Sequence, residues 1–225
     1  MRFIAIVALA WVPGLHAHDL ITAESAARYL QEADTWGSAG QHADAHYRLG
    51  MMRDEIRVLL NQDLAAHGKV QGLPSNYLIE ELARRGTPLP KGKRGFVFDP
   101  VHFEKALKLA PHGAFAADAG FRLLQGSFYD SFEQDPLDWR SEGRPLPSQI
   151  ALAEELLARH AGHPAREEIE FIAAILYTRA ARQPELSSGY ADKARRALDG
   201  FAARYPASLR AAAVPVLREA VNIAR

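Results

Sequence analysis

The stretch that decides the fold is ALDGFAARYPASLRAAA, residues 197–213, in which an amphipathic segment runs into a short turn and then an alanine-rich segment. Two other stretches follow the same plan: FEKALKLAPHGAFAADA at 103–119 and ALAEELLARHAGHP at 151–164. Each places Pro or Gly between two helical patterns, and the turns lie about 45–50 residues apart, within the range of helical solenoids. The sequence therefore predicts an all-α fold of stacked antiparallel helix pairs.

Helical periodicity also dominates the rest of the chain, and strand patterns are almost absent. In residues 45–64, apolar side chains recur at steps of three and four, as in an amphipathic helix. Proline and glycine interrupt the pattern at 87–99 and 134–147, which we expect to be loops. An irregular helical bundle with ordinary short turns is the alternative to a repeat. The predicted helices are 45–64, 75–85, 101–109, 114–132, 150–159, 164–181, 190–205 and 208–224.

The first 17 residues have the parts of a secretory signal peptide. Arg2 is followed by an apolar run at 3–11, a break at Pro13-Gly14 and a small residue at the expected cleavage site. The run is about half the length of the roughly 20 residues that span a bilayer, and no later stretch is apolar enough to do so. We therefore expect residues 1–17 to be removed and 18–225 to form one helical domain. A short membrane anchor or a buried N-terminal helix is the alternative.

The amino-acid composition limits the cellular compartments and the kinds of partner that we expect for this protein. Of the 225 residues, 27 are Lys or Arg, 27 are Asp or Glu, and none is Cys. A near-neutral chain lacks the basic face that non-specific nucleic-acid binding needs. Without Cys, an exported protein has neither disulfides nor the residue that carries a lipoprotein anchor. We expect a soluble periplasmic or secreted protein without stable membrane insertion after cleavage.

Residues near the C-terminus resemble the tetratricopeptide-type repeats of bacterial envelope proteins, the BamD/CpoB-like class. The resemblance lies in Tyr190-Ala191, in Phe201, and in Tyr205-Pro206-Ala207-Ser208 before an alanine-rich helix. It extends over residues 101–225 only, and it implies a tetratricopeptide-like superhelix that acts as a scaffold in the envelope. The chain departs from that class in its lack of a lipid-bearing Cys, its irregular repeat lengths and its two proline-rich insertions.

Sequence signatures of common enzymes are missing. The chain contains no G-x-S-x-G, H-E-x-x-H or G-x-x-x-x-G-K-[ST] motif and no Cys nucleophile. The run Lys91-Gly92-Lys93-Arg94 lacks the spacing and the hydroxyl residue of a phosphate-binding loop. We therefore expect a non-catalytic protein without a cofactor. A helical enzyme acting on peptidoglycan is a further alternative, and it would need a cleft with a buried carboxylate.

Aromatic and arginine residues gather around the second predicted loop. Such residues are typical anchors of protein interfaces. We therefore predict a surface there that binds an envelope protein or peptide, and we leave the oligomeric state open. The alternative for Phe128 and Phe132 is a place in the core. The predicted surface consists of Phe128, Tyr129, Phe132, Trp139, Arg140 and Arg144.

Histidines offer a second class of function, metal binding. His42 and His46 are four residues apart and would share one face of a helix. Cleavage after Ala17 would make His18 the N-terminal residue, whose amine and ring nitrogen together can chelate copper. Surface histidine pairs are common, and copper sites of the second kind occur in β-sandwich proteins. Metal binding is therefore the alternative to a scaffold.

Overall fold

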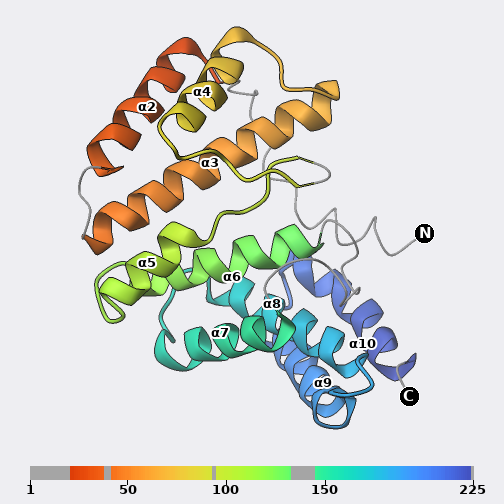
Figure 1. The fold of residues 1–225 in the computed structure, drawn as a ribbon. Coiled ribbons are helices and arrows are strands. Elements are labelled where there is room, and N and C mark those ends of the chain that lie inside the picture. Colours follow the sequence, from red (N-terminus) through yellow and green to blue (C-terminus); the bar gives the residue numbers. More distant parts are fainter. Residues whose placement is uncertain (1–20, 38–41, 93–94, 133–144, 224–225) are drawn as a thin grey trace. The chain divides into compact units, whose positions relative to one another are not determined.

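The computed structural model describes residues 21–37, 42–92, 95–132 and 145–223 (Figure 1). Regular structure in these ranges is helical, apart from one isolated bridge between Lys91 and Phe96. The all-α prediction is confirmed, and the helices pack in pairs. The helices are α2 (Ala23–Gly37), α3 (Ala43–His67), α4 (Leu73–Arg84), α5 (Val101–Leu109), α6 (Ala116–Phe132), α7 (Leu146–Arg159), α8 (Arg166–Ala181), α9 (Ser187–Arg204), the 3-10 helix η1 (Leu209–Ala213) and α10 (Val214–Ile223).

The chain divides into two compact units whose boundary falls within α6, between Gly126 and Ser127. We call the described residues 21–126 the N-terminal unit and 127–223 the C-terminal unit. The sequence alone led us to expect one domain over 18–225, and the contacts within the chain show this finer division. The expected signal peptide, residues 1–17, lies outside the described residues.

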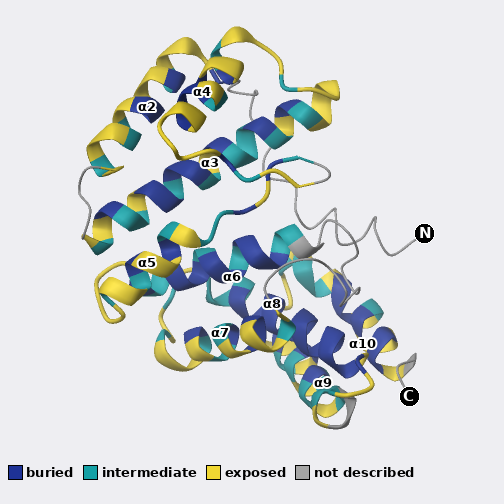
Figure 2. Ribbon diagram, viewed as in Figure 1, coloured by how far each residue is buried: buried dark blue, intermediate teal, exposed yellow. Residues whose placement is uncertain are grey.

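In the N-terminal unit, α3 is the central helix and packs against α2 and α5, while α4 packs against α2. The core is mostly aliphatic, with Ile56, Leu60, Leu78 and Leu82 fully buried, and it also contains the aromatic rings of Tyr29 and Phe96. This follows from the three- and four-residue spacing of apolar side chains on α3 and α4, which gives each helix one buried stripe. Figure 2 shows these buried stripes as dark bands along the helices, with exposed residues on the opposite faces.

Helix α2 was not among the helices predicted from the sequence, although its start carries a recognisable signal. The Thr22 amide donates to Ser25 Oγ at 2.9 Å, and the Ser25 amide donates to Thr22 Oγ1 at 3.1 Å. This reciprocal pair is a capping box built with serine in place of the usual glutamate. It satisfies amides at the start of the helix that would otherwise lack partners.

The described residues of the segment 87–99 lie outside the helices, as predicted, and two side chains of α3 hold them in place. The Arg53 guanidinium donates to the carbonyls of Thr87 and Pro88 at 2.8 and 2.9 Å and to the Asp99 carboxylate at 2.5 and 3.0 Å. Asn61 exchanges two hydrogen bonds with the backbone of Phe96, at 2.7 and 2.8 Å. The Arg53–Asp99 ion pair, in which Arg53 is buried and Asp99 is largely buried, is therefore supported by hydrogen bonds, as such a charge must be.

In the C-terminal unit, α8 is the central helix and packs against α7, α9 and α10. All its residues from Ile169 to Ala181 are buried (Figure 2). A helix that is apolar on every face is suited to such a position. Its two polar residues near the end are also buried: Thr178 donates to the Ala174 carbonyl at 2.9 Å, and Arg179 lies over the Phe128 ring at 5.2 Å.

The three helix–turn–helix stretches share one turn geometry. The C-cap residues that follow α5, α7 and α9 are Ala110, His160 and Tyr205, with φ of −144°, −125° and −126° and ψ of 75°, 56° and 54°. In each turn, the amide of the residue three positions after the cap donates to the carbonyl of the cap residue. The amide six positions after the cap then donates to the carbonyl of the residue three positions after the cap. The turns are therefore equivalent in backbone structure as well as in sequence.

Burial follows the same register. The residues seven and four positions before each cap, and the residue nine positions after it, are all buried. The buried sets are Phe103, Ala106 and Ala119; Ala153, Leu156 and Ile169; and Leu198, Phe201 and Val214.

Most predicted helix boundaries differ from the structure by one to four residues, and two of the differences have a clear cause. Helix α7 begins at Leu146 with Pro147 in its first turn, so the last two residues of the predicted loop 134–147 belong to the helix. Residues 134–144 of that loop lie outside the described residues. Proline fits the first turn because the amide it lacks has no helical partner there. The predicted helix 208–224 begins as the 3-10 helix η1 and becomes α-helical only at Val214.

Candidate partner-binding groove and histidine pair

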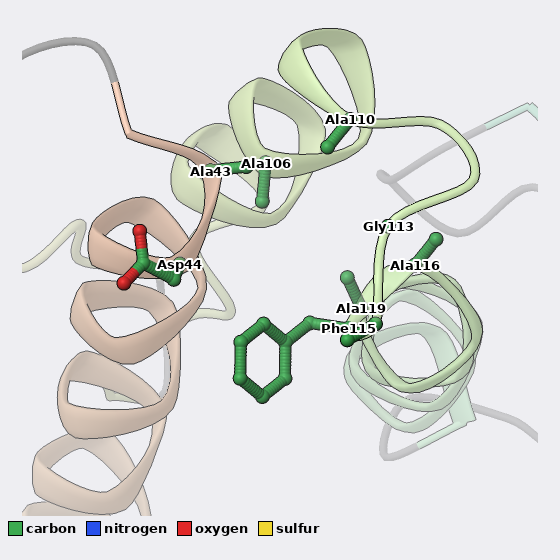
Figure 3. Close-up of a pocket in the computed structure, with 9 residues that line it drawn as sticks. Ala43, Asp44, Ala106, Ala110, Gly113, Phe115, Ala116 and Ala119 are labelled. Atoms are coloured by element: carbon green, nitrogen blue, oxygen red, sulfur yellow. The ribbon is translucent and has the colours of Figure 1, made fainter.

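A groove of about 250 Å³ lies in the N-terminal unit, between the start of α3, the end of α5 and the turn into α6 (Figure 3). Its lining is almost entirely apolar, since alanine and glycine form most of the walls. A comparison of equivalent positions in the three helix pairs explains this lining. At the positions of Ala106 and Ala119, the other two pairs carry the larger side chains Leu, Phe, Ile or Val. The lining residues are Ala43, Asp44, Ala106, Ala110, Gly113, Ala114, Phe115, Ala116 and Ala119.

Phe115 forms the aromatic edge of the groove, with its ring turned toward α3 (Figure 3). The ring is 38% exposed and stacks on Tyr47 of α3, with 4.7 Å between centroids and 10° between planes. Asp44 is the one charged residue of the lining and lies in the first turn of α3. A carboxylate at that position is also favoured by the helix dipole, so its presence alone does not indicate a ligand.

Tyr47 fixes α3 to the start of α6. Its hydroxyl donates to the Asp118 carboxylate in a short hydrogen bond. Burial, together with this carboxylate, raises the pKa of Tyr47 to about 12. The phenol is therefore neutral at physiological pH and acts as a donor that holds the aromatic edge of the groove in place.

His46 and His102 meet between α3 and α5, one helical turn away from Ala43 and Ala106 in the groove. Their Nδ1 atoms are 3.1 Å apart. Burial is the main cause that lowers the pKa of His102 to about 4, with Arg53 and His46 adding to the effect. His102 is therefore neutral at pH 7.

The predicted aromatic and arginine surface is only partly within the described residues. Phe128 is 1% exposed and belongs to the core, so its ring is not available to a partner. Tyr129 is half-buried and donates to Glu168 at 3.2 Å. Burial and the Glu168 charge raise the Tyr129 pKa. The side chains of Phe132, Trp139, Arg140 and Arg144 lie outside what the structure describes.

The carboxylates at the start of α8 are engaged in structural contacts. Glu170 is 6% exposed and accepts from Arg166 and Arg204, both at 2.9 Å. Glu167 accepts from Ser208 Oγ at 2.6 Å, and Glu168 accepts from Arg210 at 3.3 Å. These bonds link α8 to the end of α9 and to Ser208 and Arg210 at the start of η1. They give the three acids a role in holding helices together.

The predicted metal ligands lie in three different settings. His42 is exposed at the N-terminal end of α3, His46 pairs with His102, and His18 lies outside the described residues. Within the described ranges, no group of three or more His, Cys, Asp or Glu side chains is placed to hold a metal ion. In the same ranges, no helix has both the length and the apolar character to cross a bilayer.

The chain matches no protein-family model, and it has no significant match among the curated proteins or the solved structures.

Sequence reasoning missed Tyr47, His102, Phe115 and Asp118. His102 is 56 positions from His46, and Asp118 is 71 positions from Tyr47. No local sequence pattern indicates that residues so far apart in the chain form a pair. A signal for the groove was present in the spacing of Ala106, Ala110, Ala116 and Ala119, which leaves one side of the helix pair without large side chains.

Proposed function

We propose that this protein is an exported, non-catalytic helical-repeat scaffold that binds a protein or peptide partner. The observation that carries the proposal is the threefold recurrence of one turn, with equivalent buried positions on both sides of it. Helix pairs repeated in this way commonly serve to present binding surfaces. The envelope resemblance of residues 101–225 and the signal-peptide pattern of residues 1–17 support the periplasm, or the exterior, as the place of action.

The groove of the N-terminal unit is our candidate for the contact. Its volume of about 250 Å³ lies below the range of about 300–1,000 Å³ for small-molecule sites. Its lining of Ala, Gly and Phe offers almost no polar group to orient a substrate or cofactor. The groove suits one aliphatic or aromatic side chain on a partner peptide. In our proposal Phe115 covers that side chain.

The residues Tyr129, Phe132, Trp139, Arg140 and Arg144 remain a predicted second surface. The argument for them is the composition of the loop, since aromatic and arginine side chains are typical interface anchors. Phe128 is no longer part of this surface, because it is buried.

The proposal is tested by capture. The mature protein, residues 18–225, is immobilised and exposed to an envelope extract, and the retained proteins are quantified by mass spectrometry. We expect a specific partner to be retained by the wild type. Ala110→Leu fills the groove and should reduce retention about tenfold, which corresponds to roughly 1.4 kcal/mol.

Ala66→Leu is the matched control, because Ala66 is exposed on α3 and is not part of the groove. It should retain the partner as the wild type does. The double variant Trp139→Ala with Arg140→Ala tests the second surface separately. Equal retention by all these variants would contradict both sites, and the absence of any specific partner would contradict the scaffold proposal.

A further inference from the structure

A second cavity of the N-terminal unit, of about 320 Å³, is lined by the end of α3, by α4 and by two antiparallel segments, 90–92 and 95–97. This volume is at the lower end of the range of about 300–1,000 Å³ for small-molecule sites. Four apolar side chains line the cavity: Phe96, which is 4% exposed, and Leu64, Val70 and Ile79, which pack against the core of the unit.

The backbone of Lys91, a residue of the cavity lining, keeps two hydrogen-bonding groups open. Lys91 and Phe96 form an antiparallel bridge. The residues that flank them exchange backbone hydrogen bonds of 2.7 and 3.0 Å, so the amide and carbonyl of each bridge residue point away from the partner strand. Asn61 bonds to both groups of Phe96. The amide and carbonyl of Lys91 form no hydrogen bond with the described residues.

Two opposite charges also line the cavity, Lys91 and Glu80 of α4. Lys91 Nζ lies 5.3 Å from the centroid of the Phe96 ring. Within the described ranges, neither Lys91 nor Glu80 forms an ion pair, and they do not pair with each other. A cation, an anion and an apolar lining are together complementary to a molecule that carries a carboxylate, an ammonium group and an apolar side chain.

We propose that this cavity binds a free α-amino acid with an apolar side chain. Its carboxylate accepts from the Lys91 amide and pairs with the Lys91 ammonium group. Its own ammonium group donates to the Lys91 carbonyl and pairs with Glu80. A ligand that exchanges both backbone bonds with Lys91 extends the bridge as a paired residue of a third strand does. The apolar side chain of the ligand packs against Phe96 and Ile79.

The two charges favour a free amino acid over an extended peptide. A residue inside a peptide can form the same two backbone bonds, but it has neither a carboxylate for Lys91 nor an ammonium group for Glu80. The cavity shares no lining residue with the groove beside Phe115. This inference therefore does not rest on the scaffold proposal, and purified protein tests it without a protein partner.

The test is a titration of the mature protein, residues 18–225, with L-leucine, followed by NMR spectroscopy of the backbone amides. We expect saturable shifts of the Lys91 and Phe96 amides. L-leucinamide lacks the carboxylate and N-acetyl-L-leucine lacks the ammonium group. Each should bind about tenfold more weakly than leucine, because each loses a charged hydrogen bond. N-acetyl-L-leucinamide, which mimics a residue inside a peptide, should bind more weakly still.

Substitutions of the two charged residues assign each charge to one end of the ligand. Lys91→Met should weaken leucine binding about threefold, as expected for an exposed ion pair, and should not weaken leucinamide binding. Glu80→Gln should weaken leucine binding about threefold and should not weaken N-acetyl-leucine binding. The matched controls are Lys108→Met and Glu24→Gln, at exposed positions of the same unit outside the cavity. Both should bind leucine as the wild type does.

Three results would overturn the proposal. The first is the absence of saturable shifts at Lys91 and Phe96 with leucine. The second is equal binding of leucine and N-acetyl-L-leucinamide, which is the result expected for an extended peptide. The third is a loss of binding in Lys91→Met or Glu80→Gln that is the same for leucine, leucinamide and N-acetyl-leucine, since such a loss reports a change in structure and not a charge contact.

Discussion

Arg53 shows how much of the N-terminal unit depends on one side chain that no sequence motif marks. It is 6% exposed, and its guanidinium binds Asp99 and two carbonyls of the segment 87–99. That segment is rich in Pro and Gly and buries Leu89, Phe96 and Phe98. Its backbone carbonyls still need donors, and the polar contacts with Arg53 supply them; such contacts are strong only while they are complete.

Replacing Arg53 should be costly. Arg53→Met leaves Asp99 buried without its cation and two carbonyls without donors, and removing one partner of a buried ion pair typically costs about 3–5 kcal/mol. We expect a loss of about 3 kcal/mol in the free energy of unfolding, measured by urea denaturation. Arg28→Met removes an exposed pair with Glu55 and should cost less than about 1 kcal/mol. Equal effects of the two substitutions would show that the Arg53 contacts do not support the fold.

At the residue scale, local sequence patterns predicted which residues are buried more successfully than they predicted which residues contact one another. The periodic apolar positions on α3 and α8 are buried as their spacing indicated. The partners of individual polar residues could not be predicted. Spacing on one helix predicts that His42 and His46 share a face, but it cannot show that the ring of His46 contacts His102, because the packing of α3 on α5 decides which rings meet.

At the scale of elements, one close approach explains a glycine in the middle of a helix. Gly126 lies in α6, and a Cβ added there would overlap the ring of Phe98. Phe98 itself is buried and stacks on Phe103 of α5, with 5.9 Å between centroids. The absence of a side chain at Gly126 therefore lets the segment before α5 lie against α6.

Two glycine substitutions should have opposite effects. Gly126→Ala overfills the contact with Phe98 and should destabilise the protein by about 1–3 kcal/mol. Gly189→Ala in α9 meets nothing within 4 Å and should stabilise it by about 0.5–1 kcal/mol, because alanine loses less backbone entropy in a helix. Thermal unfolding of both variants checks the pair. A stabilising Gly126→Ala would mean that α6 does not approach Phe98 as closely as described.

The repeated turn gives a second prediction for elements. Ser208 Oγ accepts from the Arg210 amide at 3.1 Å, and His163 Nδ1 accepts from the Ala165 amide at 3.1 Å at the equivalent position. Ser208→Ala should cost about 1–2 kcal/mol, the usual range for a lost helix cap. Ser148 is exposed in the first turn of α7, and Ser148→Ala should change the unfolding free energy by less than about 0.5 kcal/mol. If Ser208→Ala and Ser148→Ala lowered the unfolding free energy by similarly small amounts, the result would contradict a capping role for Ser208.

Periodicity predicted the helices from 45 onward well, including the bounds of α5. It missed α2, whose capping box uses a serine where glutamate or glutamine is usual. It also did not distinguish η1 from α10, because the alanine-rich segment 211–213 suits both types of helix. The groove was missed for a related reason: alanine fits a close helix contact and an empty wall equally well, and only the packing shows which occurs.

For the whole molecule, export is the first expectation to test. Cleavage after Ala17 predicts a mature chain that begins with His18 and is recovered from the periplasm or the medium. N-terminal sequencing of the native protein, with metal analysis of the same sample, checks this and the metal alternative together. A chain that keeps Met1 in the cytoplasm would remove the envelope argument. Stoichiometric copper or zinc would replace the scaffold proposal.

The central claim is that the groove of the N-terminal unit binds a partner in the envelope, and cross-linking in the cell tests it most directly. A photoreactive amino acid is placed at Ala114, an exposed residue of the groove lining, and separately at Ala66, which lies outside it. We predict a discrete adduct with one protein from Ala114, weakened by Ala110→Leu, and none from Ala66. An exported, folded protein that forms no adduct from Ala114, or the same adducts from both positions, would contradict the claim.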